Sequence, residues 1–329
     1  MTRPRDGGGP DRREFLAFGL GVVVVAAVPL AQRRRRIVRR TMPAMGTIIQ
    51  VAVVHRDERY AHAAIDAAFG ALAGVERDMT RFTSTSDIGR ANLRAAGQPV
   101  AVTARTAQVI DEALRWAGAT DGRYDPAVGA AVALWDVNHR QTPPPDERVR
   151  VLAGRRLYRA VEVGTRASGP VVLFHDEAVQ LDLGAIAKGF AVDCAVTELR
   201  EWGITDAMVC AGGDLYAMGR DLDGEPWRVG IQDPLDPSRL AGTLMLSEQA
   251  VATSGDYEQF FRHHGVRYHH LIDPTTAAPR RTVVHSGTIV ADRCMVADVA
   301  ATAAFGLDPA AAQRLIRLRA PDAHHVRNL

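Results

Sequence analysis

The sequence has little of three features that identify common classes of protein. Its three cysteines, Cys194, Cys210 and Cys294, form no CxxC pair, so neither a disulfide framework nor a thiolate metal site is indicated. It contains no GxGxxG fingerprint between a strand and a helix, no GxxxxGK[ST] loop and no HExxH helix. The usual dinucleotide, P-loop and zinc-protease sites are therefore not predicted.

Lysine is almost absent as well. Lys and Arg together number 40, and Lys188 is the single lysine among them. A compact, flexible ammonium at one position indicates a role that a planar guanidinium would perform badly. The alternative is that the single lysine is there by chance.

Basic charge is concentrated at the start of the chain. Ten arginines and three acidic residues lie in the first 40 positions, which leaves 30 basic and 35 acidic residues in the remainder. The body is therefore mildly acidic, and nucleic-acid binding is not predicted. With 329 residues, of which 47% are hydrophobic, the chain has ample material for a buried core.

The N-terminus is typical of an export signal. Arg12 and Arg13 precede an apolar stretch that runs to Ala31, the layout of a twin-arginine signal. A cleaved signal and an uncleaved membrane anchor both fit residues 1–31. We interpret residues 32–41 as a basic linker and residues 42–329 as the folded body, placed in the periplasm or at the extracytoplasmic face of the inner membrane.

The body alternates strand and helix patterns, which predicts a mixed α and β protein with one catalytic unit. Apolar residues at helical spacing run from Ile65 to Met79. Further helices are expected over residues 104–119, 186–202 and 294–305, and strands over residues 46–55, 171–174, 178–183, 207–210, 227–232 and 268–273.

The lysine lies in the segment "LDLGAIAKGFAVD". A strand pattern meets Gly184 and a helix follows, so N–H groups at the helix start could face a phosphate with Lys188 beside them. The alternative is a tight turn in which Gly184 and Gly189 only allow close packing.

The segment "MVADVAATAAFG" places Asp298 and Thr302 one helical turn apart, on one face. A carboxylate and a hydroxyl there suit a hard cation such as Mg²⁺. The alternative is an Asp that caps or pairs locally and a Thr that bonds back to the Asp298 carbonyl.

Residues 251–274 contain two His-His pairs, His263 with His264 and His269 with His270. In a strand His269 and His270 point to opposite faces, so at most one of them lines a pocket. A four-histidine zinc site and a simple polar hairpin are the competing interpretations.

These segments together resemble one family, the FAD:protein FMN transferases, also called ApbE. The likeness runs in order from about Met45 to Gly306 and is carried by nine blocks: "MGTIIQV", "MTRFTSTSDIGRAN", "GRYDPAVGAAVALW", "LDLGAIAKGFAVD", "AGGDLYAMG", "PWRVGIQDP", "ATSGDYEQFF", "YHHLIDP" and "ADVAATAAFG". The resemblance implies an α+β fold with mainly antiparallel or mixed sheets flanked by helices. It also implies Mg²⁺-dependent transfer of FMN from FAD to a Thr or Ser hydroxyl of another protein, with release of AMP.

The resemblance also implies roles for individual residues. Asp298, Thr302 and the carbonyl of Ala185 would hold Mg²⁺, Lys188 would neutralise phosphate or orient the Asp182 region, and His270 would act as the base or position the hydroxyl. The FAD-lining set would be Met45, Phe82, Arg123, Tyr124, Asp125, Asp182, Lys188 and Ile272.

The sequence departs from the family pattern at a few positions. Cys210 stands where an Asn is common, and Thr275 and Ala277 replace the Arg and Gly of "DPRTG". None of these changes removes a residue of the expected site, although nucleotide affinity or acceptor choice could change.

The expected partner is an exported or membrane flavoprotein. An FMN subunit of a redox complex and the accessory flavoprotein of nitrous oxide respiration both fit, and membrane proximity would follow. Two alternatives remain at this point: an FAD pyrophosphatase that yields FMN and AMP, and a non-enzymatic periplasmic flavin-binding or assembly factor.

Overall fold

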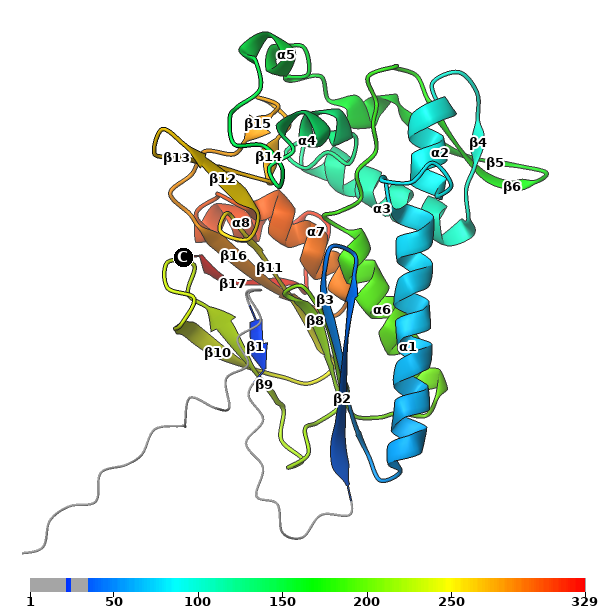
Figure 1. The fold of residues 1–329 in the computed structure, drawn as a ribbon, viewed down its shortest axis with the longest axis vertical. Helices are drawn as coiled ribbons and strands as arrows, with labels where there is room; N and C mark the ends of the chain where they lie inside the picture. Colours follow the sequence, from blue (N-terminus) through cyan, green and yellow to red (C-terminus); the bar gives the residue numbers. More distant parts are fainter. Residues whose placement is uncertain (1–21, 25–34, 329) are drawn as a thin grey trace, which may run out of the picture.

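A computed structural model describes residues 22–24 and 35–328 (Figure 1). Its centre is a seven-stranded antiparallel sheet with the order β17-β16-β11-β8-β7-β3-β2. The strands are β2 (Arg36–Ala44), β3 (Thr47–His55), β7 (Ala207–Ala211), β8 (Asp214–Met218), β11 (Gln249–Gly255), β16 (Ser286–Ala291) and β17 (His324–Asn328).

Three helices pack on one face of this sheet: α1 (Glu58–Met79), α6 (Ala187–Glu201) and α7 (Cys294–Ala304). Alternate residues of each strand point to this side, as Ala207 and Val209 of β7 do, and they form the main core with the apolar stripes of the helices. Figure 1 shows the long α1 helix beside α6, on the side of the sheet away from β9 and β10.

The opposite face of the sheet is covered by a second, smaller sheet of β1 (Val22–Val24), β9 (Trp227–Gln232) and β10 (Leu240–Leu246). Met208 and Leu215, the alternate residues of β7 and β8, pack there against Trp227 and Val229. The body therefore has three layers, with one core on each side of the central sheet.

The remaining elements gather at one end of the sandwich, at the top of Figure 1. They are α2 (Asp87–Arg94), α3 (Ala104–Ala119), α4 (Gly129–Trp135), α5 (Asp146–Arg150), the 3-10 turn Leu157–Ala160, and the sheet of β4 (Val100–Ala101), β5 (Val161–Arg166) and β6 (Gly169–Phe174). The hairpins of β12 (Phe260–His263) with β13 (Val266–His269), and of β14 (Ile272–Asp273) with β15 (Ala278–Pro279), lie beside them, and α8 (Pro309–Arg317) follows α7.

The structure confirms the α+β prediction, with antiparallel sheets flanked by helices, and two strand predictions were wrong. Residues 178–183 form no strand, because the segment makes only the isolated bridge between Val128 and Gln180, single backbone bonds such as Asp182 N–H to Pro126 O (2.8 Å), and hydrogen bonds to the side chain of Asn92. Residues 268–273 are divided between β13 and β14, because the imidazole of His269 accepts from Leu271 N–H (3.2 Å) and interrupts the ladder.

The start of the fold also differs from the prediction. Residues 36–40, assigned to a solvated linker, belong to β2 and pair with β3 from Arg36↔His55 onward, so the sheet begins before Thr41. Val22–Val24, inside the predicted signal, pair with β9, whereas Arg12 and Arg13 lie outside the described residues. Within the part of the chain that the structure describes, no helix has the length and apolar character to cross a membrane.

Candidate active site

The site is built where α6 and α7 cross. Gly189 lies so close to α7 that a Cβ there would be 2.3 Å from the carbonyl oxygen of Cys294. The carboxylate of Asp193, on α6, accepts from the N–H groups of Cys294 (2.7 Å) and Met295 (3.0 Å) and so caps the start of α7. Glycine at 189 and the cap by Asp193 together bring the first turns of the two helices into contact.

This crossing places Asp298 at the N-terminus of α6. Its Oδ2 accepts from Gly189 N–H at 3.0 Å, one of the donors that the first turn of a helix leaves unpaired. The N–H of Ala187 donates a hydrogen bond to Leu183 O (2.8 Å). The anion at this helix start is therefore the chain's own Asp298 carboxylate, at a position where the sequence suggested a phosphate.

Lys188 lies among several oxygen atoms. Its Nζ is 3.2 Å from Asp298 Oδ1, 3.4 Å from Asp298 Oδ2 and 3.2 Å from the carbonyl of Gly184. Asp214 Oδ2 lies 2.7 Å away and forms a closer ion pair with the ammonium than Asp298 does. Burial alone would lower the pKa of Lys188, but Asp214 and Asp298 outweigh it and raise the pKa, so the ammonium stays charged.

Carboxylates outnumber the ammonium in this cluster. Burial, followed by the charge of Asp298, raises the pKa of Asp214 to about 7, although Lys188 acts in the opposite direction. Burial and then Asp214 raise the pKa of Glu258 to about 8, and the Oε1 of Glu258 is buried without a partner in the described chain. At pH 7 these values leave Glu258 largely protonated and Asp214 partly protonated, so Asp298 and the ionised fraction of Asp214 share the charge of the one ammonium.

The residues expected to hold a cation include Asp298 of this cluster. Asp298 and Thr302 present a carboxylate and a hydroxyl from successive turns of α7, and Thr302 Oγ1 lies 3.3 Å from Ser254 Oγ on β11. Ala185 precedes α6 in the same segment as Gly184. Oxygen donors of this kind suit Mg²⁺. No group of three or more His, Cys, Asp or Glu residues within the described ranges is arranged to hold a metal ion.

The two adjacent histidines differ in their contacts. His269 is buried, donates from Nε2 to Arg280 O (2.7 Å) and accepts at Nδ1, so both nitrogens are used by the backbone. His270 is anchored by its own N–H to Gln259 O (3.1 Å), and its Nδ1 is buried without a hydrogen-bond partner among the described residues. Burial, reinforced by His269, lowers the pKa of His270 to about 4, so its imidazole is neutral at pH 7.

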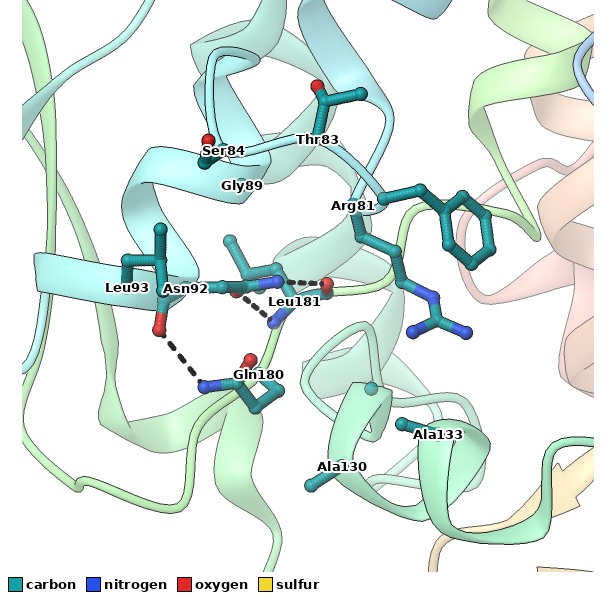
Figure 2. Close-up of a pocket in the computed structure, with 12 residues that line it drawn as sticks. Arg81, Thr83, Ser84, Gly89, Asn92, Leu93, Ala130, Ala133, Gln180 and Leu181 are labelled. Carbon is teal, nitrogen blue, oxygen red and sulfur yellow. Dashed lines mark hydrogen bonds between the residues drawn. The ribbon is translucent and has the colours of Figure 1, made fainter.

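A surface pocket with a cavity of about 270 Å³ lies between α2, α4 and the segment before α6. Figure 2 shows its lining residues, which are Arg81, Phe82, Thr83, Ser84, Gly89, Asn92, Leu93, Gly129, Ala130, Ala133, Gln180 and Leu181. Phe82 is 81% exposed. The guanidinium of Arg81 lies 4.5 Å from the centroid of that ring and pairs with Asp182 through Nε at 2.8 Å.

Neutral hydrogen bonds hold the wall of this pocket. The side chain of Asn92 donates to Leu181 O (2.9 Å) and accepts from Leu181 N–H (2.7 Å), and Gln180 Nε2 donates to Asn92 O (3.0 Å). Figure 2 shows these contacts as dashed lines between α2 and the segment that ends in Leu181. Asp182, Gly184, Ala185 and Lys188 follow in the same segment, which therefore joins the pocket to the charged cluster.

The other predicted flavin residues occupy several positions around this segment. Met45, with a left-handed φ of 53°, forms the β2–β3 turn and donates its N–H to Glu76 Oε1 (2.7 Å). Arg123 donates to the carbonyls of Ala303 and Phe305 at the end of α7. Ile272 packs in the small cluster around Trp135 and Phe261.

Tyr124 and Asp125 are both buried. The hydroxyl of Tyr124 has no partner among described residues, and burial, followed by the charges of Asp298, Asp125 and Asp182, raises its pKa. Asp125 accepts from Ala127 N–H (2.8 Å) and Tyr158 N–H (3.2 Å), while burial raises its pKa to about 6 against those bonds. Tyr124 thus lies within the electrostatic field of both the cluster and Asp182.

Sequence reasoning missed four residues of this region: Arg81, Asn92, Asp214 and Glu258. All four lie in quoted blocks: Arg81 and Asn92 in "MTRFTSTSDIGRAN", Asp214 in "AGGDLYAMG" and Glu258 in "ATSGDYEQFF". The acidic character of Asp214 and Glu258 was an available signal, whereas Arg81 and Asn92 each act through a partner that is distant in the sequence.

The fold and the site define a class: a layered α+β protein in which a helix crossing holds a lysine–carboxylate cluster beside a surface pocket. The chain belongs to the ApbE family, whose model matches residues 45–326.

Relatives and solved structures agree with this assignment. The chain is 34% identical over 268 residues to an FAD:protein FMN transferase of Vibrio cholerae, covering 79% of this chain and 78% of the relative. It is 33% identical over 309 residues to an FAD:protein FMN transferase of Treponema pallidum, covering 89% and 85%. Its structure matches that of the ApbE protein of Thermotoga maritima with a TM-score of 0.77 and 29% identity, over 85% of this chain and 90% of the other.

Proposed function

We propose that this protein is an FAD:protein FMN transferase that transfers FMN from FAD to a Thr or Ser hydroxyl of an acceptor protein. The observation that best supports this proposal is the cluster of Lys188, Asp214 and Asp298 at the α6–α7 crossing, in a chain of the ApbE family. The hydroxyl oxygen forms a bond to the phosphorus of the FMN phosphate, the bond from that phosphorus to the AMP oxygen breaks, and AMP leaves.

Asp298, Thr302 and the carbonyl of Ala185 would hold Mg²⁺. When bound, the cation supplies positive charge next to the pyrophosphate. Gly189 N–H holds Oδ2 of Asp298, and we assign the cation to Oδ1, the oxygen that contacts Lys188. Lys188 adds a permanent positive charge, since its carboxylate neighbours keep it protonated.

FAD would occupy the region between the surface pocket and the cluster. Phe82, Asp182 and Lys188 lie in or beside the segments that join the two, and Met45, Arg123, Tyr124, Asp125 and Ile272 complete the proposed lining. The exposed ring of Phe82 is free to stack on a planar ligand.

His270 would accept the proton of the incoming hydroxyl. The imidazole is neutral at pH 7, and its Nδ1 has no competing partner in the described chain. A pKa of about 4 makes it a weak base, so it would act mainly by orienting the hydroxyl and taking the proton as the new P–O bond forms.

The site of action would be outside the cytoplasm. The Arg12–Arg13 pair and the apolar residues that follow support export by the twin-arginine route, to the periplasm or the outer face of the inner membrane. The acceptor would then be an exported or membrane flavoprotein, such as an FMN subunit of a redox complex or the accessory flavoprotein of nitrous oxide respiration.

The test is incubation of the purified full-length protein with FAD and Mg²⁺, with and without a threonine-containing domain of an exported flavoprotein. AMP together with acceptor-linked flavin is the expected result. AMP with only free FMN would instead identify a hydrolase, and bound but intact FAD would identify a binding protein.

Asp298→Ala should reduce AMP release by about a hundred- to a thousandfold, because the carboxylate is the charged ligand of the proposed cation. Asp111→Ala is the matched control, since Asp111 forms an exposed ion pair with Arg115 on α3. Equal activity of the two variants would contradict the role of Asp298.

A further inference from the structure

The ammonium of Lys188 lies where it competes with a cation for Asp298. It approaches both oxygens of that carboxylate, at 3.2 Å and 3.4 Å, and also the carbonyl of Gly184, at 3.2 Å. These are oxygen ligands of the kind that Mg²⁺ prefers, and Gly184 is the neighbour of Ala185. Lys188 therefore neutralises the carboxylate that the proposed function gives to the metal.

The two oxygens of Asp298 are not equivalent. Oδ2 accepts from Gly189 N–H at 3.0 Å, whereas Oδ1 has a hydrogen bond from Lys188 and from no other described residue. Mg²⁺ binds oxygen at about 2.0–2.1 Å, so a cation on Oδ1 would be close to an ammonium that lies 3.2 Å from the same atom. Like charges at such a separation repel, and the ammonium has to withdraw from Asp298.

Asp214 is placed to receive it. This carboxylate is 3% exposed, at the start of β8 directly after the turn of Gly212 and Gly213, which have left-handed φ values of 63° and 98°. Its Oδ2 lies 2.7 Å from the ammonium, nearer than either oxygen of Asp298, so the two groups already form an ion pair. When the ammonium withdraws from Asp298, this contact with Asp214 is the one that can hold it.

We propose that Asp214 is a positioning residue, which takes over the ammonium of Lys188 when a divalent cation binds Asp298 and thereby sets the affinity for that cation. The inference rests on the proposed function for its cation site. It assigns Asp214 a role that acts through Lys188, with no contact to the metal or to the transferred group.

The test measures Mg²⁺ binding alone, by isothermal titration calorimetry on the full-length chain without FAD. Four proteins are compared: the wild type, Lys188→Met, Asp214→Asn, and the double variant. Asp214→Asn should weaken Mg²⁺ binding by about tenfold, because Lys188 is left with Asp298 as its one carboxylate partner. In the Lys188→Met background the same change should cost at most about threefold, since no ammonium needs a second partner.

Lys188→Met alone provides a second readout that needs no variant of Asp214. It should bind Mg²⁺ more tightly than the wild type, because the competing charge has gone. Asp78→Asn is the matched control, as Asp78 is a buried carboxylate paired with an arginine, Arg105, away from the cluster. Its Mg²⁺ affinity should equal that of the wild type.

The outcomes separate this inference from the proposed function. If Asp214→Asn lowers the Mg²⁺ affinity equally in the wild-type and Lys188→Met backgrounds, Asp214 acts through its charge alone. If Lys188→Met binds Mg²⁺ as tightly as the wild type or more weakly, Lys188 does not compete with the cation for Asp298. Either result overturns the inference and leaves the cation site standing. A wild type that binds no Mg²⁺ overturns both.

Discussion

The charged cluster and the surface pocket are held together in opposite ways. In the cluster, Lys188, Asp214 and Asp298 satisfy one another inside the fold, and the α6–α7 crossing that brings them together leaves no room for a Cβ at Gly189. In the pocket, neutral hydrogen bonds from Asn92 fix the backbone, and rim side chains such as Phe82 and Leu93 are exposed to solvent. The difference teaches that the exposed rim should behave unlike the buried parts. Changes at the helix crossing, in the cluster or in the pocket wall should affect folding as well as ligand binding, whereas changes at the pocket rim should affect binding with little effect on folding.

The largest effect is expected at the helix crossing. Gly189→Ala would place a methyl group 2.3 Å from the backbone carbonyl of Cys294, so the helices must move apart. We expect a loss of about 2–3 kcal/mol in the free energy of unfolding, measured by urea denaturation.

Gly70→Ala, in α1, is the control for the helical preference of alanine, because nothing lies within 4 Å of the added methyl. It should stabilise the protein by about 0.5–1 kcal/mol. If Gly189→Ala behaves in the same way, the close crossing is not what builds the cluster.

The next effect is the pH dependence of the cluster. The raised pKa of Glu258, about 8, means that the native state holds a proton which the unfolded chain releases near its ordinary value of 4.5. The free energy of unfolding should therefore fall as pH rises through that interval. Asp214, Lys188 and Asp298 are the charged groups that act on Glu258, and the raised pKa of Asp214 acts in the same direction.

Glu258→Gln should reduce the fall in stability between pH 6 and pH 8 by about 2 kcal/mol, measured by urea denaturation with a chelator present. The part that remains belongs to Asp214 and other groups. A variant with the same slope as the wild type would show that Glu258 does not hold this proton.

In the pocket wall, Asn92→Ala removes two hydrogen bonds to the backbone of Leu181. We expect a loss of about 1–2 kcal/mol in stability and a higher KM for FAD, because the segment leading to Asp182 and Lys188 loses its support. Asn138→Ala, which removes one exposed contact with Gln259, should change neither quantity, and equal effects of the two changes would refute the assignment.

The smallest effect on folding is expected at the pocket rim. Phe82→Ala should leave the stability within about 0.5 kcal/mol of the wild type, because the ring is 81% exposed. FAD affinity, measured by fluorescence titration, should fall by about tenfold through lost stacking. Leu235→Ala, at a 72% exposed site outside the pocket lining, should change neither the stability nor the FAD affinity. If Phe82→Ala lowers the stability and Leu235→Ala does not, the proposed difference between the pocket rim and the buried cluster is wrong.

Local patterns in the sequence were enough for the fold class and several elements. The helix predicted over 104–119 has those bounds, and α7 begins at Cys294 as expected, because their apolar periodicity and end signals are local. The segment 178–183 looked like a strand for the same local reason, but it bonds to the side chain of Asn92 and to the loop of Pro126 and Val128 in place of a neighbouring strand.

The site was less accessible to sequence reasoning. Asp298 and Thr302 share a helical face, which spacing predicts, but the ion pair of Lys188 with Asp214 depends on how a helix and a strand meet in three dimensions. The resemblance placed His270 and the proposed cation ligands. Partners that are distant in the sequence, such as Arg81 for Asp182, could be identified only from the folded structure.

The single lysine of the chain also makes the cluster directly observable. Protein produced with ¹⁵N- or ¹³C-labelled lysine would carry one side-chain label, and it would lie between Asp214 and Asp298. One magnetic resonance signal would then report every exchange of partner at that ammonium, without assignment of the rest of the spectrum. The composition that leaves the enzyme with one lysine has also given it a built-in probe at the point where its charges meet.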